Sequence, residues 1–213
     1  PLVTKVHMEV KKHAKSNKDI ILIGHEGHPE VEGTMGRHIN AENSSIYLVQ
    51  DEVDATNIQV KNSKSLALVT QTTLSVDETM SIIEILKKRF PKIEIPKKDD
   101  ICYATQNRQD AVKQLALESD YIIVVGSKNS SNSNRLKELA EKCGCKSILI
   151  DEFSDLDLED LQKFENIAIT AGASAPESRV MEIAKSLENY FDARLTEDGD
   201  CLLYTSPSPR DTS

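Results

Sequence analysis

The feature that most constrains the fold of this chain is an internal repeat with a period near 100 residues. Gly24 and Gly126 are 102 positions apart, and Thr70 and Thr170 are 100 positions apart. In each copy an expected helix leads into a short apolar strand, a polar loop that contains glycine, and two further short strands. Short apolar strands that alternate with helices are typical of a parallel sheet covered on both faces. The sequence therefore predicts an α/β protein with two copies of one parallel-sheet unit.

The expected elements follow the same order in both copies. The helices cover about residues 2–16 and 103–118, and the strands that follow them cover 20–23 and 121–125. The remaining strands are predicted at 46–49, 66–69, 147–150 and 167–169. Residues 91–100, with two prolines and a run of charges, are expected to link the two copies.

Composition excludes several classes of protein. An apolar share of 38% over 213 residues can support one large core or two small ones. The net charge of −9 argues against a nucleic-acid binder, and no apolar run approaches the roughly 20 residues that cross a bilayer. The four cysteines are too sparse for a disulfide framework, which favours a reducing compartment.

Residues 130–133, with the sequence Ser-Ser-Asn-Ser, lie between an expected strand and an expected helix. In open α/β sheets, ligands gather at the carboxyl ends of strands, where helix N-termini present unpaired N–H groups. Hydroxyl, amide and backbone donors in one arc suit a phosphate, and Lys128 and Arg135 could add charge. The alternative is that Ser133 or Asn132 merely caps the helix. Because a cap needs only one residue, four polar residues in a row favour an anion site.

Two hydroxyl groups follow the third strand of the two copies. Ser174 has the capping-box spacing to Glu177, so it is expected to cap a helix, a role that competes with ligand binding. Thr72, taken alone, is typical of ordinary turn chemistry. Neither residue would be assigned to a site from its own pattern.

His25, His28 and Glu30 crowd the loop after the first strand, and Pro29 is expected to begin a short helix capped by His28. A zincin motif needs two histidines four positions apart on one helix, whereas these are three apart and interrupted by Pro29. A zinc hydrolase that uses His25 and His28 is therefore a minor alternative. His28 and Glu30 are either acid–base groups or surface residues on this pattern alone.

Cys102 follows a run of Lys and Asp and directly precedes an expected helix, where a cluster ligand would be useful. The alternative is a buried, inert thiol. Cys143 and Cys145 flank Gly144 at an expected helix end, and we interpret both as incidental.

Five segments together resemble the LytB family of 4-hydroxy-3-methylbut-2-enyl diphosphate reductases. They begin at Ile23, Thr70, Lys97, Gly126 and Thr170 and read IGHEGHPEVEG, TQTTLSVDET, KKDDICYATQNRQ, GSKNSSNSNR and TAGASAPE. The resemblance covers residues 1 to about 195 and implies three α/β units in a trefoil-like arrangement around a central site. It implies that residues 1–97 are the second unit and 98–195 the third, with the N-terminal unit missing. We interpret residues 196–213 as a truncated end and, from Cys201, the translated sequence of a sequencing adapter.

The resemblance also implies an activity. The complete protein is expected to convert 4-hydroxy-3-methylbut-2-enyl diphosphate into isopentenyl and dimethylallyl diphosphates with two electrons and two protons. Substrate binding is implied for His28, Thr72, Ser130, Ser131, Asn132 and Ser174. Proton delivery is implied for Glu30 with Thr72. Cys102 is implied to be one of three thiolates on a 4Fe-4S cluster, the other two belonging to the missing unit, so the chain alone is expected to be inactive.

Expectations about partners also follow from the resemblance. They are a ferredoxin- or flavodoxin-type electron donor, a diphosphate substrate, and no nucleic-acid or membrane partner. The expected location is the bacterial cytoplasm, with a plastid as the alternative. A competing hypothesis treats the chain as a redox-inactive diphosphate-binding α/β module.

Overall fold

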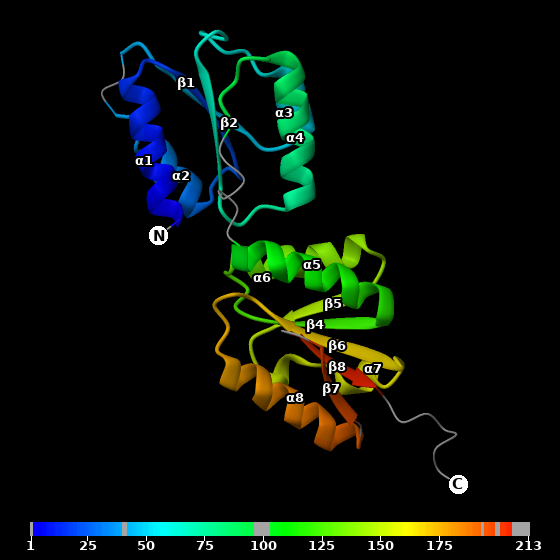
Figure 1. Ribbon diagram of the computed structural model, residues 1–213. Coiled ribbons are helices and arrows are strands. Elements are labelled where there is room, and N and C mark those ends of the chain that lie inside the picture. The colour runs from blue at the N-terminus through cyan, green and yellow to red at the C-terminus, as the bar shows by residue number, and fades with distance from the viewer. Residues whose placement is uncertain (1, 40–41, 96–102, 193, 199–200, 206–213) are drawn as a thin grey trace. The chain divides into compact units, whose positions relative to one another are not determined.

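The structure is a computed structural model that describes residues 2–39, 42–95, 103–192, 194–198 and 201–205 (Figure 1). It divides into two compact units, Pro1–Tyr103 and Ala104–Ser213. Each unit contains its own sheet and its own hydrophobic core. Cys102 lies outside the described residues.

The first unit contains a three-stranded parallel sheet in the order β2-β1-β3. Its strands are β1 (Asp19–Ile23), β2 (Ile46–Val49) and β3 (Leu66–Thr70). Its helices are α1 (Leu2–Lys15), α2 (Pro29–Met35), α3 (Glu52–Asn57) and α4 (Val76–Arg89). The helices α1 and α2 cover one face of the sheet, and α3 and α4 cover the other (Figure 1).

The central strand β1 is buried along its whole length. Ile20 and Leu22 pack with Val6 of α1 in the core under α1 and α2. Ile21 and Ile23 belong to the core on the opposite face, under α3 and α4. Full burial of one such side chain contributes about 1.5–3 kcal/mol. A strand covered on both faces needs a continuous apolar run, which is the pattern that the sequence shows here.

A buried carboxylate joins the strands at the start of this sheet. Asp19 is 2% exposed, and its Oδ1 accepts a hydrogen bond from the backbone N–H of Ser45 at 2.9 Å. Its Oδ2 accepts from the backbone N–H of Asn62 at 2.8 Å and from the hydroxyl of Tyr47 at 3.2 Å. Ser45 precedes β2 and Asn62 precedes β3, so one side chain on β1 fixes both neighbouring strands.

The second unit has five strands in the order β5-β4-β6-β8-β7. The strands β4 (Tyr121–Val125), β5 (Lys146–Ile150) and β6 (Asn166–Ala171) are parallel. The strand β8 (Cys201–Thr205) is antiparallel to both β6 and β7 (Arg194–Asp198). The helices are α5 (Tyr103–Glu118), α6 (Ser131–Lys142), α7 (Leu158–Leu161) and α8 (Glu177–Phe191), with the short 3-10 helix η2 (Phe153–Asp155). Figure 1 shows α5 and α6 on one face of this sheet and α7 and α8 on the other.

The predicted α/β class and the two parallel-sheet units are confirmed. The repeat does not predict β7 and β8, because these strands have no counterpart among the described residues of the first copy. The predicted start of the linker at residue 91 is too early, because the first residues of that segment pack in the first unit. The backbone N–H of Leu68 donates to the carbonyl of Glu94 at 2.8 Å, and Ile93 is only 8% exposed.

Candidate polar site at the carboxyl ends of the parallel strands

In each unit, two neighbouring strands are followed by helices that lie on opposite faces of the sheet. The chain leaves β1 for α2 on one face and leaves β3 for α4 on the other. In the second unit it leaves β4 for α6 and β6 for α8 in the same way. Ligands of open α/β sheets bind outside the carboxyl ends of the strands at such a point of divergence. The predicted site residues that the structure describes follow these four strands.

Strand register shows which residues of the two units are equivalent. Ile23 pairs with Thr70 in the first sheet, and Val125 pairs with Ala171 in the second. Thr70 is therefore equivalent to Ala171, whereas the sequence repeat aligned it with Thr170. The sequence repeat was aligned on identical residue types, whereas the strand register aligns equivalent backbone positions.

The same register matches the polar residues at the two sheet edges. His28 and Ser130 are the N-cap residues of α2 and α6, and Glu30 and Asn132 each lie two residues after the cap. Counting on from the paired strand ends makes Thr72 of the first unit equivalent to Ala173 of the second. The two units therefore share a backbone scaffold but present different chemistry, an acid with a hydroxyl in one and an amide in the other.

The carboxylate of Glu30 is held by Thr72 at both of its oxygens. Its Oε1 accepts from the backbone N–H of Thr72 at 2.8 Å, and its Oε2 accepts from the Thr72 hydroxyl at 3.0 Å. Thr72 is 5% exposed, and Glu30 is half-buried. Hydrogen bonds to an ionised carboxylate are short and strong, so this pair has a defined geometry. The structure thus brings together the two residues that the resemblance assigns to proton delivery.

His28 is the N-cap of α2, as predicted, with Pro29 as the first helical residue. Its Nδ1 accepts a hydrogen bond from the backbone N–H of Glu30 at 3.1 Å. Because Nδ1 is the acceptor, neutral His28 carries its proton on Nε2, a tautomer assigned from this hydrogen bond. The half-buried side chain can then donate from Nε2.

A glutamine that the sequence analysis did not single out supports this edge. Gln71 is 1% exposed, and its side-chain oxygen accepts from the backbone N–H of His25 at 3.1 Å. Its amide nitrogen donates to the hydroxyl of Thr73 at 3.0 Å. Gln71 thereby connects the loop after β1 to the loop after β3. A polar residue directly after a buried strand is the only sequence signal for this role, and it is a weak one.

In the second unit, Ser130 is the helix cap. Its hydroxyl accepts from the backbone N–H of Ser133 at 3.3 Å, so the alternative of Ser133 or Asn132 as the cap is wrong. Asn132 is 7% exposed, and neither its amide nitrogen nor its amide oxygen has a hydrogen-bond partner among the described residues. Buried amides without partners are rare, so this side chain has unused hydrogen-bonding capacity beside the first turn of α6. Ser131 is the first residue of that helix.

The expected capping role of Ser174 is wrong. The N-cap of α8 is Pro176, and within the described ranges no side chain caps this helix. The cap therefore lies two residues later than the sequence spacing implies, after a turn in which the N–H of Ala175 donates to the carbonyl of Gly172 at 3.0 Å. Ser174 is exposed, so its hydroxyl is not committed to the helix.

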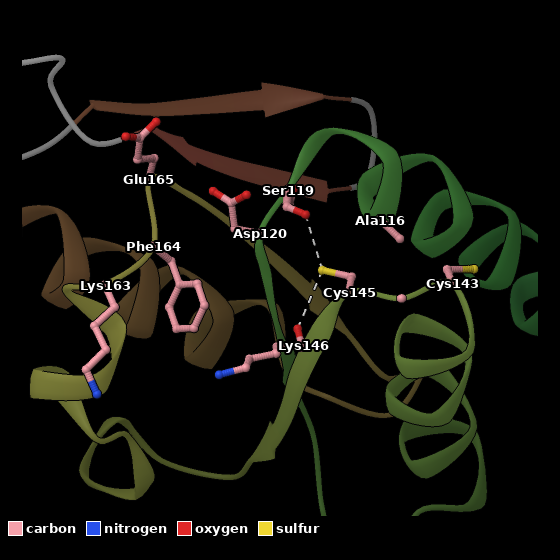
Figure 2. Close-up of a pocket in the computed structure, with 10 residues that line it drawn as sticks. Ala116, Ser119, Asp120, Cys143, Cys145, Lys146, Lys163, Phe164 and Glu165 are labelled. Atoms are coloured by element: carbon pink, nitrogen blue, oxygen red, sulfur yellow. Dashed lines mark hydrogen bonds between the residues drawn. The ribbon is translucent and has the colours of Figure 1, made fainter.

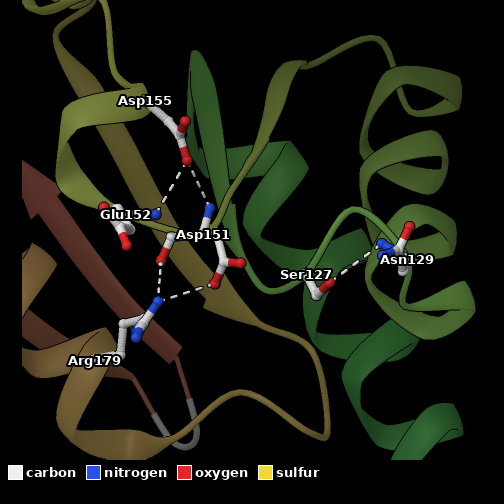
Figure 3. Close-up of polar contacts among 6 residues, drawn as sticks. All are labelled: Ser127, Asn129, Asp151, Glu152, Asp155 and Arg179. Atoms are coloured by element: carbon white, nitrogen blue, oxygen red, sulfur yellow. Dashed lines mark hydrogen bonds and ion pairs between the residues drawn. The ribbon is translucent and has the colours of Figure 1, made fainter.

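Two carboxylates after β5, those of Asp151 and Asp155, have hydrogen-bond or ionic partners. Arg179 contacts Asp151 twice, at 3.0 Å to its Oδ1 and 3.1 Å to its carbonyl oxygen (Figure 3). The backbone N–H groups of Asp151 and Glu152 donate to Asp155 and hold the pKa of that carboxyl below its ordinary value. Arg135, expected to add charge for an anion, instead pairs with Glu138 at 2.7 Å.

Cys143 and Cys145 lie at the opposite edge of the second sheet, beside the start of β5 (Figure 2). They line a cavity of about 550 Å³ together with Phe164 and the side chains around it. The Cys145 thiol donates to the carbonyl of Ser119 at 3.3 Å, and burial raises the pKa of this thiol. A neutral, buried thiol is a poor metal ligand and a poor nucleophile. This cysteine pair lies away from the edge with Ser130, which is formed by the carboxyl ends of the strands.

The described residues do not form a metal site by themselves. No group of three or more His, Cys, Asp or Glu side chains that could hold a metal ion occurs within the described part of the chain. The zinc alternative at His25 and His28 therefore lacks a third ligand there. The described residues likewise offer no set of thiolates that fits a four-iron cluster, and Cys102 lies outside them.

The fold and the site define an α/β protein with polar side chains collected at the carboxyl edges of two parallel sheets. The sequence matches the family described as LytB protein over residues 1–188, so the chain belongs to the LytB family. Among the described residues, no helix is both long enough and apolar enough to span a membrane.

Relatives with curated names support this membership. The chain is 58% identical over 188 residues to the 4-hydroxy-3-methylbut-2-enyl diphosphate reductase of Saccharophagus degradans, which covers 88% of this chain and 60% of that protein. It is 57% identical to the reductase of Ectopseudomonas mendocina, over 92% of this chain and 63% of that one. The chain therefore spans about three-fifths of the length of these relatives.

A solved structure gives the same result for the fold. The E-1-hydroxy-2-methyl-but-2-enyl-4-diphosphate reductase of Plasmodium falciparum superposes with a TM-score of 0.82 at 38% identity. The match covers 89% of this chain and 58% of that one.

Proposed function

We propose that this chain is part of a 4-hydroxy-3-methylbut-2-enyl diphosphate reductase that forms isopentenyl and dimethylallyl diphosphates. Family membership and the names of the relatives support this function. The observation that carries it in the structure is the carboxylate of Glu30 held at both oxygens by Thr72, at the edge where α/β proteins bind ligands. Removal of a hydroxyl group requires a proton source at the leaving oxygen, and this pair can be one.

The diphosphate is proposed to bind at the first turn of α6 in the second unit. The helix N-terminus offers backbone N–H groups and the positive end of its dipole. The unpartnered amide of Asn132 supports the assignment, because a ligand oxygen would satisfy its buried N–H groups. Ser130, Ser131 and Ser174 supply hydroxyl groups, and His28 supplies the N–H on Nε2.

Proton delivery follows from the hydrogen bonds of Glu30. When Glu30 is protonated on Oε2, its O–H can donate to the hydroxyl oxygen of Thr72, 3.0 Å away. The Thr72 hydroxyl then directs its own proton away from Glu30, toward the leaving oxygen of the substrate. Each passage along this route moves one proton and leaves Glu30 ionised and still held by the Thr72 backbone N–H. The buried position of Thr72 limits competition from water.

Cys102 is proposed as one thiolate ligand of a 4Fe-4S cluster, with the remaining ligands outside this chain. Such a cluster, if bound, would supply the electrons for the reduction. A ferredoxin- or flavodoxin-type protein is the proposed electron donor, and the cytoplasm the proposed location. A single thiolate cannot hold a four-iron cluster, so the chain alone is expected to have no reductase activity.

The proposed place of the chain in the complete protein is that residues 1–97 and 98–195 are two of three similar units. The two separate sheets and cores support this assignment, as does the greater length of the relatives. Residues 196–213 are proposed to lie outside the family sequence. The family match itself extends to residue 188.

The test uses the complete protein, made by adding the part of a relative that this chain does not span. After anaerobic reconstitution with iron and sulfide, it is mixed with 4-hydroxy-3-methylbut-2-enyl diphosphate and a reduced viologen dye. The expected result is formation of isopentenyl and dimethylallyl diphosphates. Tight substrate binding without iron–sulfur absorbance or product would instead support the redox-inactive diphosphate-binding module.

A further inference from the structure

Ser133 occupies a notch between two glycines at the edge of the second sheet. It is fully buried, with 0% exposure, and its hydroxyl has no hydrogen-bond partner among the described residues. A Cβ atom added to Gly126 would lie 2.3 Å from the Ser133 Oγ, and one added to Gly172 would lie 2.1 Å from it. Both distances are too short for any real contact, so glycine is required at both positions while Ser133 is present.

The three residues of this notch come from three different segments of the chain. Gly126 directly follows β4, Ser133 is in the first turn of α6, and Gly172 directly follows β6. The backbone N–H of Gly172 donates to the carbonyl of Val125 at 2.9 Å, which keeps the ends of β4 and β6 together. The Ser133 side chain therefore packs where the two strand ends and the helix N-terminus meet.

The first unit has a similar contact made by an apolar residue. A Cβ added to Gly24, the counterpart of Gly126, would lie 2.5 Å from a methyl group of Val31, which follows Glu30 as Ser133 follows Asn132. Since valine cannot bind a ligand through a hydrogen bond, this position serves packing in the first unit. The Ser133 hydroxyl oxygen lies against the Gly126 and Gly172 positions, so this side chain likewise serves packing.

We infer that Ser133 is a positioning residue for the diphosphate site, whose side-chain volume sets the spacing between the first turn of α6 and the Gly172 loop. This inference rests on the proposed function. Asn132 precedes Ser133 on the helix and Ser174 follows Gly172 in the loop, so the spacing at the notch decides whether these two residues reach one ligand. A buried hydroxyl without a partner lowers the stability of the folded protein. The presence of serine at position 133 is therefore explained by the volume of its side chain, and not by a hydrogen bond.

The inference predicts opposite effects on stability and on affinity. In the complete protein, Ser133→Ala removes one buried polar atom, so the thermal midpoint stays equal to or above that of the parent. The first turn of α6 and the Gly172 loop move closer to each other. The inhibition constant of inorganic pyrophosphate and the KM for substrate therefore each rise on the order of tenfold, while kcat stays within about twofold of the parent value. Ser186→Ala, at a half-buried serine on α8 whose hydroxyl donates to the carbonyl of Glu182, is the matched control and changes none of these values.

A rescue experiment separates positioning from general destabilisation. Gly172→Ala forces its new methyl group against the Ser133 Oγ and is expected to weaken pyrophosphate inhibition by more than about tenfold. Adding Ser133→Ala removes that atom and leaves a Ser133 Cβ contact at 3.2 Å, so the double variant recovers most of the affinity.

The outcomes decide the inference without depending on whether Gly172→Ala folds. An unchanged pyrophosphate inhibition constant in Ser133→Ala, or a fall in kcat with KM unchanged, overturns the positioning role. A double variant no better than Gly172→Ala also overturns it. If the parent protein turns over substrate yet pyrophosphate does not compete with it, the proposed diphosphate site fails first, which distinguishes that failure from failure of the Ser133 role.

Discussion

Replacement of Glu30 by glutamine separates the chemistry of this residue from its structural role. Glutamine has the same shape, and its side-chain oxygen can accept from the Thr72 backbone N–H as Oε1 does now at 2.8 Å. Its amide nitrogen can donate to the Thr72 hydroxyl oxygen, which replaces the present 3.0 Å bond with one of reversed direction. The two loops therefore stay connected, but no carboxyl proton remains.

The two consequences differ in magnitude. Two hydrogen bonds to a charged group become neutral ones, and each change costs about 1 kcal/mol of folding stability at most. Loss of a general acid typically lowers the rate by about 100-fold to 10,000-fold, or about 2.7–5.4 kcal/mol in the activation barrier. The account predicts a protein that folds and binds substrate but turns over at most about 1% as fast.

The assay is single-turnover reduction of substrate by the reduced complete protein, with substrate affinity measured separately by equilibrium binding. Glu32→Gln is the matched control, because Glu32 is an exposed acid on the same helix. The control is expected to keep the parent rate. The reasoning is refuted if Glu30→Gln weakens only binding and leaves the chemical step unchanged, since Glu30 would then be a positioning residue.

The other predictions concern binding, stability and thiol chemistry. Ser131→Ala should weaken substrate binding by roughly 1.5–3 kcal/mol through loss of a donor to a charged group, with the single-turnover rate at saturation retained; an unchanged Kd in calorimetry would contradict it. Asp19→Ala leaves three hydrogen-bond donors of the first unit unsatisfied and should lower its unfolding free energy by about 3–5 kcal/mol in a urea titration. In thiol alkylation followed by mass spectrometry, exposed Cys143 should react well before buried Cys145. Because burial raises the pKa of Cys145, the folded state should lose stability as pH rises above the ordinary thiol value of 9.0, and Cys145→Ala should reduce that loss.

Much of the scaffold could be predicted because each strand is a short apolar run between polar loops. The predicted strands 46–49 and 121–125 coincide with β2 and β4, and the helix at 103–118 coincides with α5. Pro29 after His28 gave the start of α2 for the physical reason that proline fits the first helical position. Helix starts and strands that are set by local sequence are retained in the folded protein, because the tertiary packing is compatible with them.

The errors have tertiary causes. Ser174 has the spacing of a helix cap, but the chain turns at Gly172 and begins α8 after Pro176. Only the sheet register shows that Thr70 is equivalent to Ala171, since a sequence comparison cannot detect a one-residue shift between copies. Spacing along the chain carries no information about a contact made across the sheet.

The candidate site was predictable in part. Polar residues after strands point to the correct edge of the sheet, yet no local pattern shows that Glu30 reaches Thr72, 42 residues away in the sequence. The role of Gln71 and the packing role of Ser133 were not predicted, because both consist of tertiary contacts with His25, Gly126 and neighbouring groups. Sequence identifies residue types suited to a chemistry, and the fold decides which of them meet.

The most direct test of the account is a crystal structure of the complete protein with 4-hydroxy-3-methylbut-2-enyl diphosphate bound. The account predicts diphosphate oxygens within hydrogen-bonding distance of the Asn132 amide and the Ser131 hydroxyl, at the first turn of α6. It also predicts that the substrate hydroxyl lies beside Thr72, with Glu30 behind it. A diphosphate bound elsewhere, such as in the cavity beside Cys143 at the opposite edge of the sheet, with the Asn132 amide still unpartnered, would contradict the account.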